Sequence, residues 1–283
     1  MERFDLVGIG SYAFRNAIRS KENPMDAIDF LKMVADLGLK RALLCENLNY
    51  IEKGDEYIHT LANLASQYDI TIEVGMRVAT KNNLIRHIEV AKILNTKLIR
   101  LVLGEMGHNT LLNTEDRTCL KEQALGAIKK VLPLLEEANI YLGIENHFDL
   151  KAVELLDLVQ RINSKRVGLI FDSTNCLGLI EEPVKVLHLM EGYVFSVHLK
   201  DYICEKIDGG YIFSGVDLGK GHLAVSDVIQ RAYLSNPCVS FIVEYNMHPT
   251  IKMSEEELLA WELERARKNV ALTLAAVSHN VTA

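Results

Sequence analysis

The stretch IYLGIENHFDLKAVELLDLVQRINSKRVGLIFD, residues 140–172, contains two short apolar runs separated by a longer segment with helical spacing. The runs IYLGIE (140–145) and VGLIFD (167–172) are apolar on both faces, as is typical of parallel strands buried between a barrel interior and a shell of helices. Residues 150–162 between them have the apolar spacing of a helix. The stretch therefore predicts a β-α-β unit.

The same alternation continues along the whole chain. We predict strands at residues 5–10, 41–44, 70–75, 97–103, 140–145, 167–172, 193–199 and 239–245. We predict helices at residues 25–37, 55–68, 82–94, 115–138, 150–162, 181–190, 224–234 and 255–277. Eight strands that are each followed by a helix indicate an α/β fold of the (β/α)8 barrel type.

The main alternative is a doubly wound open sheet. Such a sheet usually has a glycine-rich phosphate loop after its first strand. Here Gly8-Ile9-Gly10-Ser11 is followed by Tyr12 and Phe14 instead of a third glycine. We therefore favour the closed barrel.

Composition limits the classes of protein that need to be considered. The chain has 283 residues, 49% of them hydrophobic and 24% charged, and closed barrels of this size commonly form one domain, here 1–283. We find no run of about 18 uncharged apolar residues, and the opening MERFDLVGIG does not resemble a signal peptide. We expect a cytoplasmic protein that does not interact with membranes. The net charge of -7 argues against nucleic acid as a partner.

The five cysteines stand singly in the sequence. They are Cys45, Cys119, Cys176, Cys204 and Cys238, and none forms a CxxC pair. This spacing is typical of reduced thiols rather than of a disulfide framework or a zinc knuckle. We expect each of them to be a buried structural thiol.

Four polar residues end successive predicted strands in the second half of the chain. Glu145, Asp172, His198 and Glu244 close the otherwise apolar runs LGIE, LIFD, FSVH and FIVE. The carboxyl ends of barrel strands carry the catalytic groups, and a charge there is costly unless it is paired or bound to metal. Three carboxylates and one imidazole favour one divalent metal: Mn²⁺ first, Mg²⁺ or Co²⁺ next, with Zn²⁺ possible. The alternative is that each residue separately caps a loop or pairs with Lys or Arg.

Five sequence strings resemble those of a known superfamily. They are GIENH (143–147), FDSTN (171–175), VHLKD (197–201), VEYN (243–246) and the opening GIGSYAF (8–14). These strings resemble the xylose isomerase-like TIM barrels, the sugar phosphate isomerase/epimerase family. The resemblance spans essentially the whole chain, and its most specific part is the second half.

The resemblance implies that Glu145, Asp172, His198 and Glu244 are the metal ligands, with Glu145 and Glu244 as acid and base on opposite sides of the substrate. A metal that is chelated by a carbonyl and its neighbouring hydroxyl acidifies the adjacent C–H, so that an enediolate forms. We therefore expect an isomerase or epimerase of a sugar, sugar acid or sugar phosphate. A lyase, that is, a dehydratase or decarboxylase of an oxo-sugar acid, would use the same ligands. A non-catalytic sugar-binding barrel is the third hypothesis.

Further residues are candidates for binding the substrate, a small polyhydroxylated carbonyl compound. They are His147, Lys200, Glu46, Arg77 and Asn175, and for each the alternative is a capping role or a salt bridge. Lys151, Asn175 and Cys204 stand where ketose 3-epimerases of the superfamily carry an acid, a histidine and an arginine, which argues against free-ketose 3-epimerase activity. The cationic groups at the barrel mouth suit a substrate with a carboxylate or phosphate.

The longest irregular stretch, residues 200–223, follows the seventh predicted strand. Long loops at this end of a barrel usually shape the active-site mouth. Within it, GVDLGKGHL (215–223) is a plausible anion-binding turn, with Lys220 and backbone N–H groups available to a phosphate or carboxylate. The family resemblance also implies a homo-oligomer, either a dimer or a tetramer.

Overall fold

The structure, a computed structural model, describes residues 6–105, 112–245, 247–249 and 251–280. Two predicted features extend beyond these residues: the first residue of the strand at 5–10, and the final position of VEYN, Asn246. All other predicted elements and site residues lie within the described part of the chain.

Eight parallel strands close a barrel in the order β1-β10-β7-β6-β5-β4-β3-β2. They are β1 (Val7–Gly10), β2 (Arg41–Leu44), β3 (Thr71–Arg77), β4 (Leu98–Val102), β5 (Tyr141–Glu145), β6 (Val167–Asp172), β7 (Val194–Leu199) and β10 (Ser240–Val243). Every predicted strand is present, with ends that differ by a few residues. The (β/α)8 prediction is confirmed.

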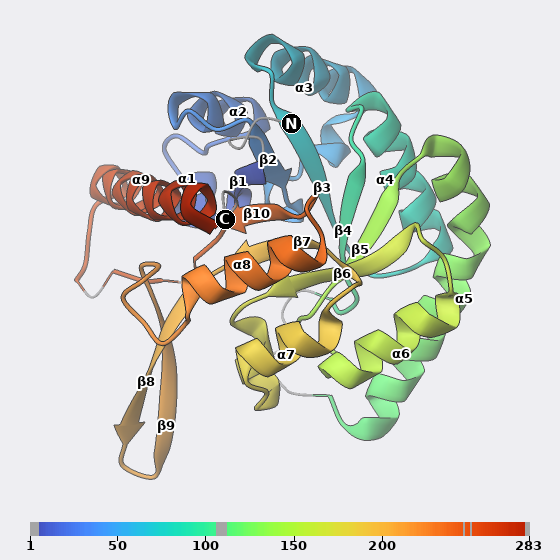
Figure 1. The fold of residues 1–283 in the computed structure, drawn as a ribbon. Helices are drawn as coiled ribbons and strands as arrows, with labels where there is room; N and C mark the ends of the chain where they lie inside the picture. Colours follow the sequence, from blue (N-terminus) through green and yellow to red (C-terminus); the bar gives the residue numbers. More distant parts are fainter. Residues whose placement is uncertain (1–5, 106–111, 246, 250, 281–283) are drawn as a thin grey trace.

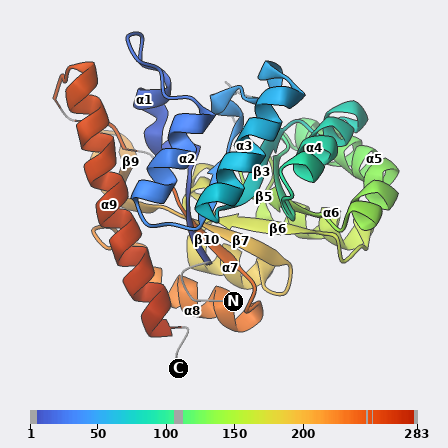
Figure 2. The same ribbon diagram turned by 90° about the horizontal axis from the view of Figure 1, so that it is seen from above.

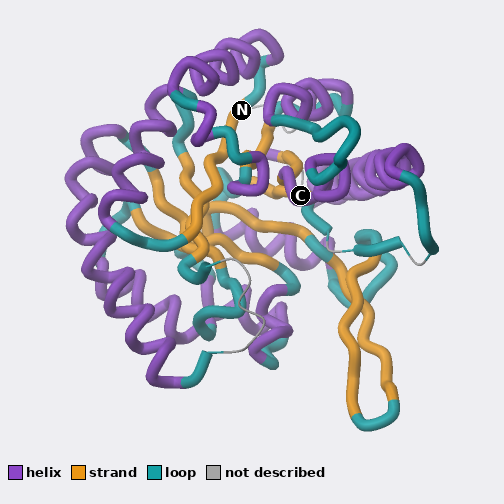
Figure 3. Tube along the Cα trace, turned by 180° about the vertical axis from the view of Figure 1, so that it is seen from behind, coloured by secondary structure: helices purple, strands orange, loops and turns teal. Residues whose placement is uncertain are grey.

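Helices surround the barrel, as Figure 1 and Figure 3 show. They are α1 (Arg15–Ile18), α2 (Ala27–Asp36), α3 (Asp55–Tyr68), α4 (Lys81–Ile93), α5 (Thr114–Ala138), α6 (Ala152–Ile162), α7 (Pro183–Met190), α8 (Val225–Ser235) and α9 (Glu255–Asn280). Short 3-10 turns are η2 (Ser11–Phe14), η3 (Glu46–Leu48), η4 (Ile51–Lys53) and η5 (Asn175–Leu179). None of the described helices is long and apolar enough to cross a membrane.

Local signals fix where these helices begin. The side chain of Asp26 accepts hydrogen bonds from the N–H groups of Ile28 and Asp29 at the start of α2, and Pro183 occupies the first turn of α7. The last helix, α9, runs beside α1 and the strands β1 and β10, where Figure 2 shows it along one side of the barrel. The carboxylate of Glu262 on α9 accepts hydrogen bonds from the N–H groups of Asn16 and Ala17, which ties α9 to the loop after β1.

Residues 200–223, predicted to be irregular, instead contain an antiparallel hairpin. Strands β8 (Asp201–Ile207) and β9 (Gly210–Val216) pair in a register that leaves Asp208 and Gly209 as a two-residue turn. Gly209 has a φ of 85°, which is the left-handed conformation that such turns require. An Asp-Gly pair between β-compatible runs is a hairpin signal, so the sequence contained the information that the prediction overlooked.

The cysteines meet the prediction only in part. All five are free thiols, as expected, and Cys45 and Cys176 are buried. Cys119, Cys204 and Cys238 are exposed, so the predicted burial is wrong for these three. Cys119 lies on the outer face of α5 and Cys204 lies on the hairpin, where solvent replaces the core that a buried thiol would contact.

Candidate metal centre and its surrounding cavity

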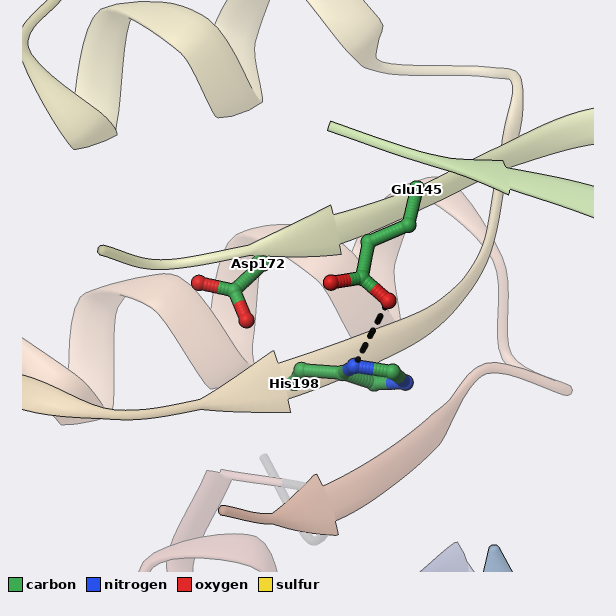
Figure 4. Close-up of side chains that lie close together, drawn as sticks. All are labelled: Glu145, Asp172 and His198. Atoms are coloured by element: carbon green, nitrogen blue, oxygen red, sulfur yellow. Dashed lines mark ion pairs between the residues drawn. The ribbon is translucent and has the colours of Figure 1, made fainter. Parts of the chain in front are cut away.

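The predicted ligands come together at one end of the barrel because the strands that carry them are neighbours. Glu145 is the last residue of β5, Asp172 is the last residue of β6, and His198 lies one residue before the end of β7. In the sheet register Asp172 lies directly beside His198, and Figure 4 shows the three side chains converging. Glu244 directly follows β10, the other neighbour of β7.

Three of these residues form a compact donor group. One potential ligand atom from each of Glu145, Asp172 and His198 lies within 4.8 Å of the others, and all three residues are buried. Glu244 lies beside this group, with its Oε1 at 3.7 Å from Nδ1 of His198, whereas Oε2 of Glu145 is 3.3 Å from the same nitrogen. The other three predicted ligands thus lie around His198.

These donors fit a divalent cation. Both ring nitrogens of His198 and Oε1 of Glu244 are buried and have no hydrogen-bond partner among the described residues. A buried polar atom without a partner costs free energy, and coordination would supply the missing partner. The set is rich in oxygen, as Mg²⁺ and Mn²⁺ prefer, while its imidazole also suits Zn²⁺ or Co²⁺.

Arg100 is a buried cation that the sequence analysis did not select. It projects from β4, forms a short ion pair with Glu145 through Nε, and places NH1 at 3.4 Å from Oε2 of Glu46. Burial alone would raise the pKa of Glu145, but Arg100 and then His198 outweigh it, so that this pKa lies well below its ordinary value. Arg100 therefore keeps the Glu145 carboxylate ionised inside the barrel.

Glu46 and Arg77 extend this network toward the mouth. Nε of Arg77 forms a short ion pair with Glu46, and the hydroxyl of Tyr12 donates to the same carboxylate at 3.0 Å. Burial would raise the pKa of Glu46, but Arg100 and Arg77 lower it below its ordinary value. The alternative that the sequence left open, a salt bridge between mouth residues, is what the structure contains for Glu46 and Arg77.

Lys200 follows β7 and points toward the ligands. Its Nζ is 2.6 Å from Oδ2 of Asp172 and 3.1 Å from Oε2 of Glu244. Burial would lower the pKa of Lys200, but these two carboxylates outweigh it and the net pKa is raised. A permanently charged ammonium group therefore borders the donor group.

Two asparagines hydrogen-bond to the predicted ligands. Asn146 makes a pair of hydrogen bonds with Asp172, donating from Nδ2 to its carbonyl and accepting from its N–H, at 2.9 and 2.7 Å. Asn175 donates from Nδ2 to Oε1 of Glu145 at 2.9 Å. Asn175, a predicted substrate contact, therefore orients a ligand in this structure, and Asn146 is a positioning residue that the sequence analysis missed.

A cavity of about 180 Å³ opens above the donor group. Its wall combines the predicted ligands Glu145 and Glu244 with four cations and with aromatic and polar side chains: Arg15, Arg77, Arg100, Lys200, Tyr12, His147, Phe148, Asn175 and Tyr245. His147 stacks on Phe148 with ring centroids 4.1 Å apart, and its Nδ1 lies 3.7 Å from Asp149. Of the five predicted substrate-binding residues, four line this cavity, and Glu46 borders it through Arg77.

The predicted anion-binding turn at 215–223 is already occupied by the protein itself. The buried carboxylate of Asp201 accepts hydrogen bonds from the N–H groups of Gly219, Gly221 and Leu223, each at 2.9 Å. Lys220 is exposed. The expectation of an external phosphate or carboxylate at this turn is therefore wrong, because Asp201 provides the anion and anchors the base of the hairpin.

Comparison with known proteins identifies the family of this chain. A family model described as "Xylose isomerase-like TIM barrel" matches residues 8–269. A "3-oxo-isoapionate decarboxylase" from Pectobacterium atrosepticum is 27% identical over 242 residues, which cover 84% of this chain and 85% of that protein.

Two solved structures share the fold. A xylose isomerase-like TIM barrel protein from Mycobacterium smegmatis, in complex with magnesium, has a TM-score of 0.73 at 15% identity and covers 97% of both chains. A D-psicose 3-epimerase, solved in the presence of D-fructose, has a TM-score of 0.70 at 15% identity and covers 96% of this chain and 99% of that one.

The fold and the donor group define the class first: a closed β/α barrel with a possible metal site at the carboxyl ends of its strands. The chain belongs to the xylose isomerase-like TIM barrel family.

Proposed function

We propose that this protein is a divalent-metal-dependent lyase that removes CO2 from an oxo acid derived from a sugar. The observation that carries the proposal is the buried ion pair between Arg100 and Glu145. An acid/base residue works best when its pKa lies near the operating pH. Because the pKa of Glu145 is held well below its ordinary value, this carboxylate suits a metal ligand better than a proton carrier.

Decarboxylation requires fewer proton transfers at such a site than epimerisation. When CO2 leaves a 3-oxo acid, the electrons of the broken C–C bond form a C=C bond to the carbonyl carbon and the carbonyl oxygen takes the negative charge. The product is an enolate, or an enediolate where C2 carries a hydroxyl, so no base has to remove a C–H proton. A divalent cation held by Glu145, Asp172, His198 and Glu244 would supply Lewis acidity for that oxygen. We favour Mn²⁺, with Mg²⁺, Co²⁺ or Zn²⁺ as alternatives.

The charges around the cavity favour an anionic substrate. The three carboxylates of the predicted ligand set contribute -3, and Arg100 and Lys200 contribute +2. Arg77 is offset by Glu46, and Arg15 adds +1 to the cavity wall, so these groups sum to 0. A divalent ion would bring the sum to +2, which favours a substrate with a carboxylate. Lys200 and Arg77 are placed to hold that carboxylate or the developing oxyanion.

His147 is the remaining residue to which we assign a role in the proposed reaction. His147 lines the cavity, and Oδ2 of Asp149 lies 3.7 Å from its Nδ1. After CO2 has left, one proton must reach the carbon atom, and His147 is the candidate donor. The similarity to a protein described as a "3-oxo-isoapionate decarboxylase", over 84% of this chain, supports this reaction class.

An isomerase or epimerase is the second candidate. Glu145 and Glu244 approach His198 at 3.3 and 3.7 Å, which suits two groups that face a substrate from opposite sides. The shared fold with a D-psicose 3-epimerase is consistent with this candidate. A non-catalytic sugar-binding barrel is the third, since it would need neither Glu145 nor Glu244 as a reacting group.

One experiment separates the three functions. The chain is loaded with Mn²⁺ or Mg²⁺ and incubated in D2O with a panel of oxo-sugar acids and free ketoses, and products are followed by mass spectrometry and CO2 release. We expect loss of CO2 with one deuterium incorporated at carbon. Lys200→Met should raise KM for the acid, whereas Lys220→Met, a matched change of an exposed lysine, should not. Deuterium exchange without CO2 loss would support the epimerase, and no turnover of any compound would refute both enzymatic proposals.

A further inference from the structure

The hairpin β8–β9 extends away from the barrel, as Figure 1 and Figure 3 both show. It presents large apolar side chains to solvent on both of its faces. Tyr211 is 68% exposed and Phe213 is 51% exposed, while Ile207 and Ile212 are 45% and 46% exposed. A two-stranded hairpin is marginally stable in water without further packing, so this exposed apolar surface indicates that something covers it.

The two strands of the hairpin differ in charge and in what lies beside their outer edges. Along β8, the carbonyl of Tyr202 accepts a hydrogen bond from the N–H of His222, so the returning loop runs beside this strand. Glu205 and Lys206 add charges to β8, and Asp208 adds one to the turn. Charged side chains on an edge strand oppose pairing with another strand. Strand β9, with the sequence GYIFSGV (210–216), carries no charge at all.

We propose that β9 pairs antiparallel with β9 of a second copy of this chain, which joins two hairpins into one four-stranded sheet. A twofold interface must be self-complementary, and an uncharged strand meets this condition. Because each chain has a net charge of -7, two copies approach most favourably where the surface carries no charge.

The sequence of β9 suits a twofold axis at its central residue. Pairing all seven residues of Gly210–Val216 with the same strand of the second copy sets Phe213 opposite Phe213 and Tyr211 opposite Gly215. Aromatic pairs across strands are stabilising, and an aromatic ring can cover the surface that a glycine leaves bare. The side chains of Phe213 and Tyr202 already contact each other within one chain, with ring centroids 6.0 Å apart. The enlarged sheet would therefore gain one continuous aromatic face.

The first test measures the mass of the full chain by sedimentation velocity and light scattering at micromolar concentration. We expect twice the chain mass of 31.8 kDa. Phe213→Lys sets two ammonium groups opposite each other and should give monomers. The matched control is Leu234→Lys on α8, a residue that is 73% exposed and lies outside the hairpin, and it should keep the wild-type mass.

Charge rescue distinguishes a lost interface from a misfolded chain. Phe213→Lys and Phe213→Glu should each be monomeric alone and should form a mixed dimer when combined, since the opposite charges then face each other. In a background with Cys204→Ser, which removes the thiol opposite position 213 in the same hairpin, Phe213→Cys should form a disulfide between two chains when diamide is added as the oxidant. A monomeric wild type, an unchanged mass in Phe213→Lys, or no cross-link would each overturn the proposal.

Discussion

Replacing Arg100 by Met removes one charge from the interior of the barrel and keeps most of the side-chain volume. The guanidinium pairs with two carboxylates, Glu145 and Glu46, and its side chain is only 3% exposed. Breaking a buried pair by removing one partner costs about 3–5 kcal/mol, because the remaining charge is left without compensation. We expect the free energy of unfolding to fall by this amount near neutral pH.

This loss converts into a measurable shift of the melting temperature. With an unfolding entropy of about 2.1 cal/mol/K per residue, the 283 residues give roughly 0.6 kcal/mol/K. The expected decrease in Tm is therefore about 5–8 °C. Scanning calorimetry in the presence of EDTA measures it without a contribution from metal. Arg161→Met is the matched control, since Arg161 pairs with Glu122 on the exposed surface and should change Tm little.

The pH dependence of the same variant provides a second check. In the wild type the depressed pKa of Glu145 contributes stability above the ordinary pKa of a glutamate, and this contribution is lost as the pH falls through the depressed value. Without Arg100 the main effect that remains is burial, which raises the pKa and lets the carboxyl become neutral in mild acid. The difference in the free energy of unfolding between wild type and variant should therefore be largest near pH 8 and decrease toward pH 5. A difference in the free energy of unfolding below about 1 kcal/mol at neutral pH, or a difference that increases in acid, would refute the stabilising role of Arg100.

Three further predictions concern the metal site and the hairpin base. Burial lowers the pKa of His198 but the neighbouring carboxylates raise it overall, so metal affinity should increase with pH through this raised pKa, with release of about one proton in calorimetric titrations. A Cβ at Gly10 would lie 2.7 Å from Oε1 of Glu244, so Gly10→Ala should fold normally yet bind metal about 10–100-fold more weakly, as equilibrium dialysis would measure. Asp201→Asn replaces an acceptor of loop N–H groups and should lower the free energy of unfolding by about 1–3 kcal/mol in urea titrations; an unchanged midpoint would contradict the anchoring role.

The barrel could be predicted from the sequence because its strands are buried on both faces and therefore appear as unbroken apolar runs. The end of each run then marks the mouth of the barrel, which is why Glu145, Asp172 and His198 could be selected together. Arg100 was missed because it lies in the middle of the run KLIRLVL. Whether its side chain points into the barrel depends on the pleat of the strand and on Glu145, which is 45 residues away in the sequence. A single charge inside an otherwise apolar strand was the available signal.

The hairpin base shows a different limit of sequence analysis. The glycine-rich turn at 215–223 has the composition of an anion site, and it does bind an anion, but that anion is Asp201 of the same chain. A backbone N–H group donates equally well to an internal carboxylate and to a ligand. Composition can therefore indicate that a loop needs an acceptor, whereas only the three-dimensional structure can identify which one it receives.

The balance of charges at the mouth has a consequence for the order of binding. Arg100 and Lys200 already offset two of the three carboxylates of the predicted ligand set. With Arg15 and the Arg77–Glu46 pair included, the charges around the cavity sum to 0, and a divalent ion would bring the sum to +2. Since Coulomb interactions are strong in a site shielded from water, the proposed acid should bind more tightly once the metal is present. The cations that offset the carboxylates in the absence of metal would thus add to its attraction for an anionic substrate.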